Sequence, residues 1–242
     1  MNDLASRIER DGTRVSQGVL DDMYLDPFWE ARYGARGRRH ADEDSAHHLR
    51  YLAEALRGGE ASVMTNYARW LRTVLVTRGM CSAHLADNFT RLAQALRAWL
   101  PESQPALELL DQACAALRYS QGAGAFVEAH ATEWLELLAR SGEAQASGET
   151  WALTGPARMR SYLSYLADAL QLGRAELFVA HLRFVSELEQ QRGGNARGLS
   201  VALASLHERV RELGNVAHAE TASRALGAAE AALESLARGG TA

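Results

Sequence analysis

The chain has 242 residues, a mass of 26.4 kDa and 47% hydrophobic residues, which is enough apolar material for a buried core and excludes a disordered chain. All 26 basic residues are arginines, so chemistry that needs a lysine, such as a Schiff base or a P-loop, is excluded. The net charge is −4 and there is no long basic run, which argues against nucleic-acid binding.

The composition favours helix over strand. Alanine, leucine, arginine and glutamate dominate, whereas Ile8 is the single isoleucine and there are four prolines. Cys81 and Cys114 lie in apolar helical contexts without metal-ligand spacing, which is typical of a reducing compartment. No apolar run approaches 18 residues and the first residues include acids, so we expect a cytoplasmic protein that does not enter a membrane.

The elements follow one another along the chain as helices separated by glycine or proline. We expect a less regular arm over 1–41, followed by helices whose apolar spacing has a helical period. The expected helices span 42–57, 60–78, 82–100, 105–120, 125–140, 156–172, 174–191, 198–213 and 217–237. The sequence therefore predicts an all-α protein of nine to eleven helices, with an arm (1–41), a first helical unit (42–121), a linking helix and polar loop (122–155) and a second helical unit (156–242).

An internal repeat relates the two four-helix units. Segment 49–79 aligns without gaps with segment 163–193, at an offset of 114 residues. So many matches on one diagonal predict a duplication, with the same helix arrangement in both halves. The acid and the arginine that recur in both units (Glu54 and Asp168, Arg69 and Arg183) are expected to join neighbouring helices. Identical pairs include Tyr51/Tyr165, Leu52/Leu166, Ala53/Ala167, Leu56/Leu170, Gly59/Gly173, Arg69/Arg183, Arg78/Arg192 and Gly79/Gly193.

The duplication also marks residues that differ between the units and are free to have a function. Tyr67 and His181 occupy equivalent positions on the apolar stripe of each unit's second helix. His181 could bind a cofactor between Phe178 and Phe184, with Tyr67 and Trp70 as the corresponding residues of the first unit. A metal ion or a tetrapyrrole would suit such a site. The alternative is that these side chains are ordinary core residues.

Two histidines occur in the first unit alone. Glu43 and His47, like Asp44 and His48, are spaced i, i+4, which places a carboxylate and an imidazole on one helix face as metal ions require. The alternative is an acidic first turn in which Asp42 or Asp44 caps the helix.

A cluster of arginines precedes these acids. Arg36, Arg38 and Arg39 could dock onto the acidic turn, or their guanidinium groups could bind an anion or a partner. We expect this part of the arm to be ordered, because Trp29 and Tyr33 provide rings to bury beside the charges.

The repeated segment YLAEALRGGEASVMTNYARWLRTVLVTRG and its copy resemble the four-helix cap that precedes cobalamin-binding domains in regulators and methyltransferases. In that family a separate domain with an Asp-x-His-x-x-Gly motif holds the cofactor's lower face, and this chain has no such motif. The resemblance implies a helical module that senses a ligand, binds a partner or holds a flat cofactor.

Three functions follow from these features. The first is a regulatory or sensory protein, not an enzyme, that binds a small molecule or a protein partner. The second is a cofactor protein or enzyme that holds haem, bilin, corrin or a metal with core histidines. The third is an adaptor that assembles through its helix faces, and the sequence leaves a homo-oligomer open.

Overall fold

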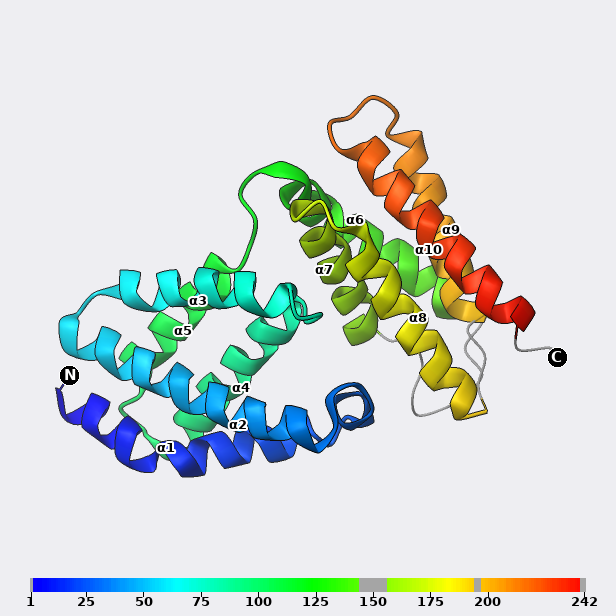
Figure 1. Ribbon diagram of the computed structural model, residues 1–242. Coiled ribbons are helices and arrows are strands. Elements are labelled where there is room, and N and C mark those ends of the chain that lie inside the picture. Colours follow the sequence, from blue (N-terminus) through cyan, green and yellow to red (C-terminus); the bar gives the residue numbers. More distant parts are fainter. Residues whose placement is uncertain (1, 144–155, 194–196, 240–242) are drawn as a thin grey trace. The chain divides into compact units, whose positions relative to one another are not determined.

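The structure is a computed structural model that describes residues 2–143, 156–193 and 197–239. Within these ranges all regular structure is helical, in ten helices (Figure 1), which confirms the all-α prediction. The polar loop predicted up to residue 155 lies, from residue 144 on, outside the described residues. The helices are α1 (Asn2–Met23), α2 (Pro27–Gly58), α3 (Ala61–Val76), α4 (Ser82–Trp99), α5 (Gln104–Ala116), α6 (Gly122–Glu143), α7 (Pro156–Gln171), α8 (Ala175–Gln191), α9 (Arg197–Glu212) and α10 (Ala219–Gly239).

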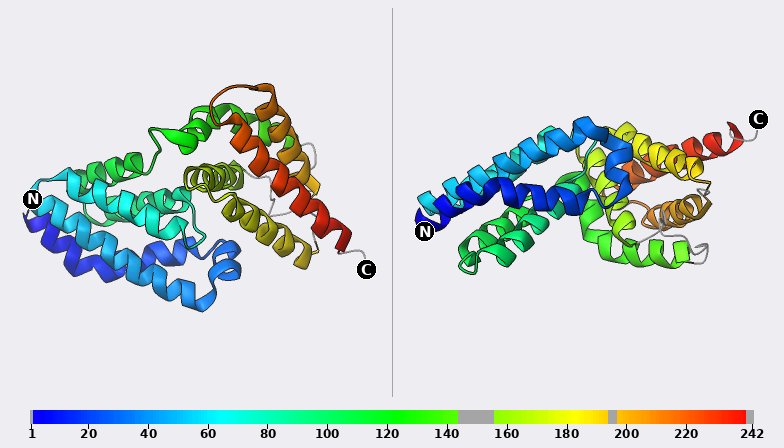
Figure 2. Two further views of the ribbon diagram at one scale, coloured as in Figure 1. Left: turned by 45° about the horizontal axis from the view of Figure 1, so that its top comes forward. Right: turned by 90° about the horizontal axis from the view of Figure 1, so that it is seen from below.

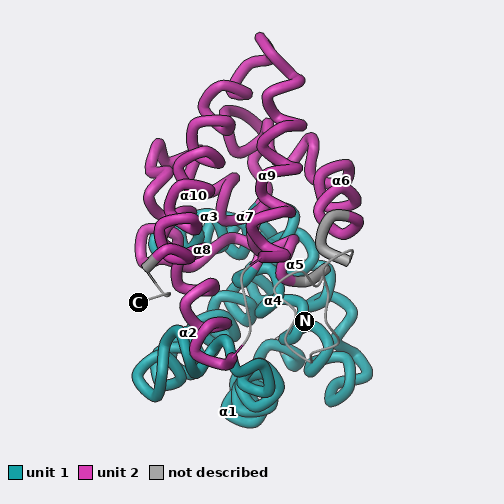
Figure 3. The backbone as a smooth tube through the Cα atoms, turned by 90° about the vertical axis from the view of Figure 1, so that its right-hand side faces the viewer, with its two compact units in different colours: residues 1–75, 84–117 teal, residues 76–83, 118–242 magenta. Residues whose placement is uncertain are grey.

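The chain forms two compact units (Figure 3). Unit 1 consists of Met1–Leu75 and His84–Leu117, and unit 2 consists of Val76–Ala83 and Arg118–Ala242. The turn between α3 and α4 therefore belongs to unit 2, together with α6 to α10. None of the described helices is both long enough and apolar enough to span a membrane.

The N-terminal arm is helical, which corrects the expectation of a less regular segment over 1–41. Helix α1 packs along α2, as Figure 2 shows. Helix α2 begins at Pro27, where Oδ1 of Asp26 accepts a hydrogen bond from the Phe28 N–H at 2.9 Å, and it bends at Gly34, whose φ is +58°. Asp42 and Asp44 lie inside this helix, so the prediction that one of them caps its start is wrong.

Helix α6 packs along α7 as α1 packs along α2. It also contacts α9, so it is an integral part of unit 2 and not a linker. Its side chain of Trp134 is fully buried. Each unit thus contains one helix more than the four predicted, placed before them in the sequence.

The helix bounds of the two units follow the 114-residue offset closely. Helix α3 begins at Ala61 and α8 at Ala175. The glycines that precede these helices, Gly59 and Gly173, both have a φ of +66°, a left-handed conformation in which glycine carries no steric penalty. Helices α3 and α4 thus begin and end within one residue of the positions that correspond to α8 and α9, whereas α2 begins well before the counterpart of the start of α7 and α10 extends beyond the counterpart of the end of α5. A common origin of the two units stays a prediction.

Candidate functional site

A buried carboxylate on α7 of unit 2 accepts hydrogen bonds from three groups. The side chain of Asp168 on α7 is 1% exposed. It accepts hydrogen bonds from the Ser82 N–H at 2.7 Å, the Ser82 hydroxyl at 2.6 Å and the Tyr119 hydroxyl at 2.7 Å. Ser82 is the first residue of α4, whose backbone N–H groups lack partners within the helix, so Asp168 satisfies a helix N-terminus.

Neighbouring side chains of α7 hold the same turn. Oγ of Ser164 accepts a hydrogen bond from the Ala83 N–H at 2.9 Å, and the hydroxyl of Tyr165 donates one to the Gly79 carbonyl at 2.9 Å. The ring of Tyr165 stacks on the imidazole of His181 from α8, with centroids 3.6 Å apart and planes 14° apart. We call Ser164, Tyr165, Asp168 and His181 the covered face, because the turn Val76–Ala83 is bound to it.

The corresponding positions of unit 1 form a face of similar ring geometry that is exposed. Tyr51 on α2 stacks on Tyr67 from α3, with centroids 3.9 Å apart and planes 16° apart. Tyr51 is 37% exposed, whereas its counterpart Tyr165 is 2% exposed. Trp70 lies 6.0 Å from Tyr67 and is 58% exposed. We call Tyr51, Glu54, Tyr67 and Trp70 the open face; Glu54, the counterpart of Asp168, is exposed as well.

A histidine lies directly beneath the open face. Nδ1 of His48 is 2.7 Å from the Tyr67 hydroxyl, and its ring meets Phe89 edge-on at 5.2 Å. Burial of this imidazole, with a smaller effect of the neighbouring His47, lowers the pKa of His48 to about 3. Burial likewise raises the pKa of the Tyr67 hydroxyl above its ordinary value. The imidazole is therefore neutral at pH 7.

Unit 2 has a histidine and a tyrosine at the same two positions, but each residue type lies on the other helix. Tyr162 on α7 replaces His48, and His181 on α8 replaces Tyr67. The ring centroids are 5.7 Å apart in both units, with planes at 62° in unit 1 and 56° in unit 2. The structure thus places Tyr67 and His181 at equivalent buried positions, where each serves as the partner on which the face tyrosine stacks.

The four residues considered as metal ligands do not converge. His48 is buried against Tyr67, while His47 is exposed beside Arg50. Glu43 is exposed and 3.3 Å from Nδ1 of His40. Within the described residues no three histidine, cysteine or acidic side chains are arranged to hold a metal ion. His47 and His48 are adjacent on the helix, so their side chains point about 100° apart and lie in different environments.

Arg38 joins α2 to α1. Its guanidinium is 2.7 Å from Oδ1 of Asp21 and lies over the ring of Tyr24, 4.9 Å from the centroid. The expected docking of this arginine onto the acids at 42–44 is therefore replaced by a contact with the preceding helix. Arg36 and Arg39 are exposed, and binding of an anion or a partner by them stays a prediction.

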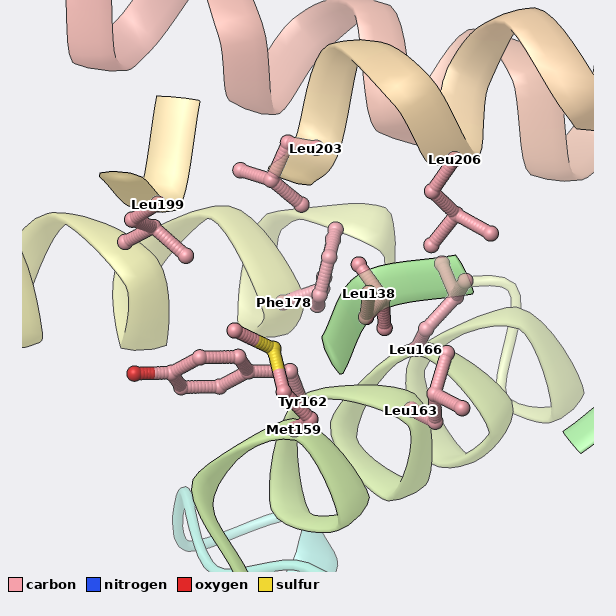
Figure 4. Close-up of a pocket in the computed structure, with 9 residues that line it drawn as sticks. All are labelled: Leu138, Met159, Tyr162, Leu163, Leu166, Phe178, Leu199, Leu203 and Leu206. Atoms are coloured by element: carbon pink, nitrogen blue, oxygen red, sulfur yellow. The ribbon is translucent and has the colours of Figure 1, made fainter. Parts of the chain in front are cut away.

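Helix α8 contributes Phe178 to an apolar cavity (Figure 4). In this view the ring of Tyr162 lies along the wall beside Met159, and leucines of α6, α7 and α9 close the other sides. The cavity volume is about 10 Å³, which is about the space that one water molecule needs. A cavity of this volume does not hold a tetrapyrrole, so binding of a cofactor by Phe178, His181 and Phe184 stays a prediction. Phe184 is half-buried on the same helix, one turn after His181.

A second polar cluster joins α9 to α10. Nδ1 of His207 is 2.7 Å from Oε2 of Glu230, and its Nε2 is 2.9 Å from Oγ of Ser223. This order of groups can activate a serine, but Ser223 lies beyond the first turn of α10, where backbone N–H groups are used within the helix and cannot stabilise an oxyanion. The cluster therefore serves as an interhelical hydrogen-bond link.

No pattern in the sequence singled out Tyr51, Tyr165, Asp168 or the turn at 76–83 as a binding contact. One signal was present, since Tyr51/Tyr165 and Gly79/Gly193 are identical across the repeat. Comparison of the chain with family models, curated proteins and solved structures yields no significant match.

Proposed function

We propose that this protein is a non-enzymatic, regulatory binding protein that holds a helix–turn segment of a protein partner on the open face of α2 and α3. One observation carries the proposal. In unit 2 the covered face, which corresponds to the open face, binds the helix–turn segment Val76–Ala83. Tyr51 stacks on its neighbour in the open face as Tyr165 does in the covered face.

The chemistry of the open face suits such a segment. Tyrosine and tryptophan provide large contact area at low entropy cost and are enriched among the residues that dominate protein interfaces. The Tyr51 hydroxyl can donate to a carbonyl at the end of a partner helix. Glu54 can accept from the N–H groups that begin the next helix, where the helix dipole favours a negative charge.

A photocrosslinking experiment tests the proposal. We expect p-benzoylphenylalanine in place of Trp70 to form a discrete adduct in the native host, and mass spectrometry to map that adduct to a helix end of the partner. The control carries the same group in place of Arg97, an exposed residue of α4 in the same unit. Equal or absent adducts at the two positions, or adducts spread over unrelated segments, would overturn the proposal.

A further inference from the structure

We infer that the open face binds a turn between two partner helices with a defined chemistry. A glycine follows the first helix, a serine or threonine comes three residues later, and an acid comes directly after it at the start of the second helix. This inference rests on the proposed function, since it gives the chemistry of the segment bound on the same face. The segment that the covered face binds, Val76–Ala83, provides the template. Arg50, which stands where the covered face has Ser164, provides the selectivity for an acid.

The glycine and the hydroxyl residue follow from the contacts of the template. Gly79 follows α3 with a φ of +85°, which glycine adopts without steric penalty, and its carbonyl accepts a hydrogen bond from the Tyr165 hydroxyl at 2.9 Å. The next helix begins at Ser82, which donates to both carboxylate oxygens of Asp168, through its N–H at 2.7 Å and its hydroxyl at 2.6 Å. A residue without a hydroxyl would make only one of these two bonds. A segment that binds in this way therefore needs the spacing Gly-x-x-Ser or Gly-x-x-Thr.

The open face has groups that can make both of these contacts. Tyr51 and Glu54 lie three residues apart on α2, as Tyr165 and Asp168 do on α7. Because both stretches are α-helical, their side chains leave the two helices in corresponding directions. Tyr51 and Glu54 are both exposed, so a partner can reach them. The phenol can donate to a glycine carbonyl, and the carboxylate can accept from the N–H and the hydroxyl of a serine.

Arg50 distinguishes the open face from the covered face. Ser164, at the corresponding position of α7, accepts a hydrogen bond from the Ala83 N–H at 2.9 Å. A guanidinium has no acceptor, so Arg50 cannot make this contact and would instead place a positive charge beside the first turn of the bound helix. Positive charge is unfavourable at the N-terminus of a helix, because the helix dipole is positive there. An aspartate or glutamate at the position of Ala83 supplies a carboxylate that pairs with the guanidinium.

The charges of the open face fix the order of the groups that it binds. Arg50 and Glu54 lie about one turn apart on α2, and both are exposed. The bound segment meets this pair with its first N–H groups and hydroxyl opposite Glu54 and its carboxylate opposite Arg50. A segment with a basic residue in place of the acid would bring like charges together, so the open face discriminates against it.

Isothermal titration calorimetry of the chain with folded probes tests the inference. Each probe is a designed three-helix bundle whose first turn has the sequence of 76–83 with Cys81→Ala, and the second probe also carries Ala83→Glu. We expect the wild-type chain to bind the second probe about ten-fold more tightly than the first, which is the effect of one charge-assisted hydrogen bond. A third probe, which adds Ser82→Ala to the second, should bind about ten-fold more weakly than the second, because it lacks the hydroxyl that donates to Glu54.

Arg50→Ser is the matched variant of the chain. It introduces the hydroxyl acceptor that Ser164 provides and removes the positive charge, so this variant should bind the first two probes with affinities within about two-fold of each other. Arg97→Ser, at an exposed arginine of α4, is the control and should keep the wild-type preference. Equal affinities of the two probes for the wild type, no binding of either, or a preference that persists in Arg50→Ser would overturn the inference.

The proposed function fails separately from this inference. The partner segment mapped by the adduct at position 70 should contain a glycine, a serine or threonine three residues later, and then an acid. A discrete adduct at a helix end without these residues would support the proposed function and overturn the inference. Absence of a discrete adduct would overturn both.

Discussion

Replacing Asp168 by alanine is expected to destabilise unit 2 by about 3–5 kcal/mol. The change removes a carboxylate that is 1% exposed and that accepts three hydrogen bonds, from the Ser82 N–H, the Ser82 hydroxyl and the Tyr119 hydroxyl. Each buried donor that loses its partner costs roughly 1–3 kcal/mol. Urea unfolding followed by circular dichroism measures the effect.

The matched variant is Glu54→Ala, at the corresponding position of unit 1. Because Glu54 is exposed, its removal should change the free energy of unfolding by less than about 0.5 kcal/mol. Equal effects of the two variants would show that the two faces do not differ in the way described.

Acidification from pH 7 to pH 4 is expected to remove about 3 kcal/mol of stability through His48 alone. The pKa of this imidazole is about 3 in the folded chain, against 6.5 for a histidine in water. Below pH 6.5 the unfolded chain binds a proton that the folded chain does not, so stability falls as the pH falls, until the folded pKa is reached.

The test compares unfolding free energies of the wild type and His48→Gln across this pH range. The variant should lose about 3 kcal/mol less than the wild type between pH 7 and pH 4, whatever its stability at pH 7. His40→Gln, at an exposed histidine of the same helix, serves as the control and should follow the wild-type curve. A His48→Gln curve parallel to the wild-type curve would contradict a neutral, buried His48.

The helices from residue 42 onward could be predicted because local signals define them. Apolar residues recur with a helical period, and glycines such as Gly59 and Gly173 end helices in a left-handed conformation that other residues avoid. The first helix was not predicted, although Leu4, Ile8, Val15 and Val19 recur with a helical period and are buried. The packing of α1 along α2 is a tertiary contact, which local sequence patterns do not predict.

The two faces could not be distinguished in the sequence, because burial depends on what lies opposite. Tyr51 and Tyr165 are the same residue type, and Glu54 and Asp168 are both acids. Tyr51 and Glu54 are nevertheless exposed, whereas Tyr165 and Asp168 are buried. The position of the turn at 76–83 on α7 creates the difference. The sequence shows that Tyr67 of one unit is replaced by His181 in the other. That both units share the same ring contact becomes clear only when the structure places His48 beside Tyr67 and Tyr162 beside His181.

Hydroxyl-radical footprinting with mass spectrometry tests most directly whether the face of α7 and α8 is covered within the chain while the face of α2 and α3 is open for a partner. In dilute protein, Tyr51 and Trp70 should be oxidised quickly and Tyr165 slowly. On addition of the partner identified by crosslinking at position 70, Tyr51 and Trp70 should become protected while an exposed control side chain, Leu25, does not change. Equal oxidation of Tyr51 and Tyr165 in the chain alone, or no protection of Tyr51 by that partner, would contradict this difference between the two faces.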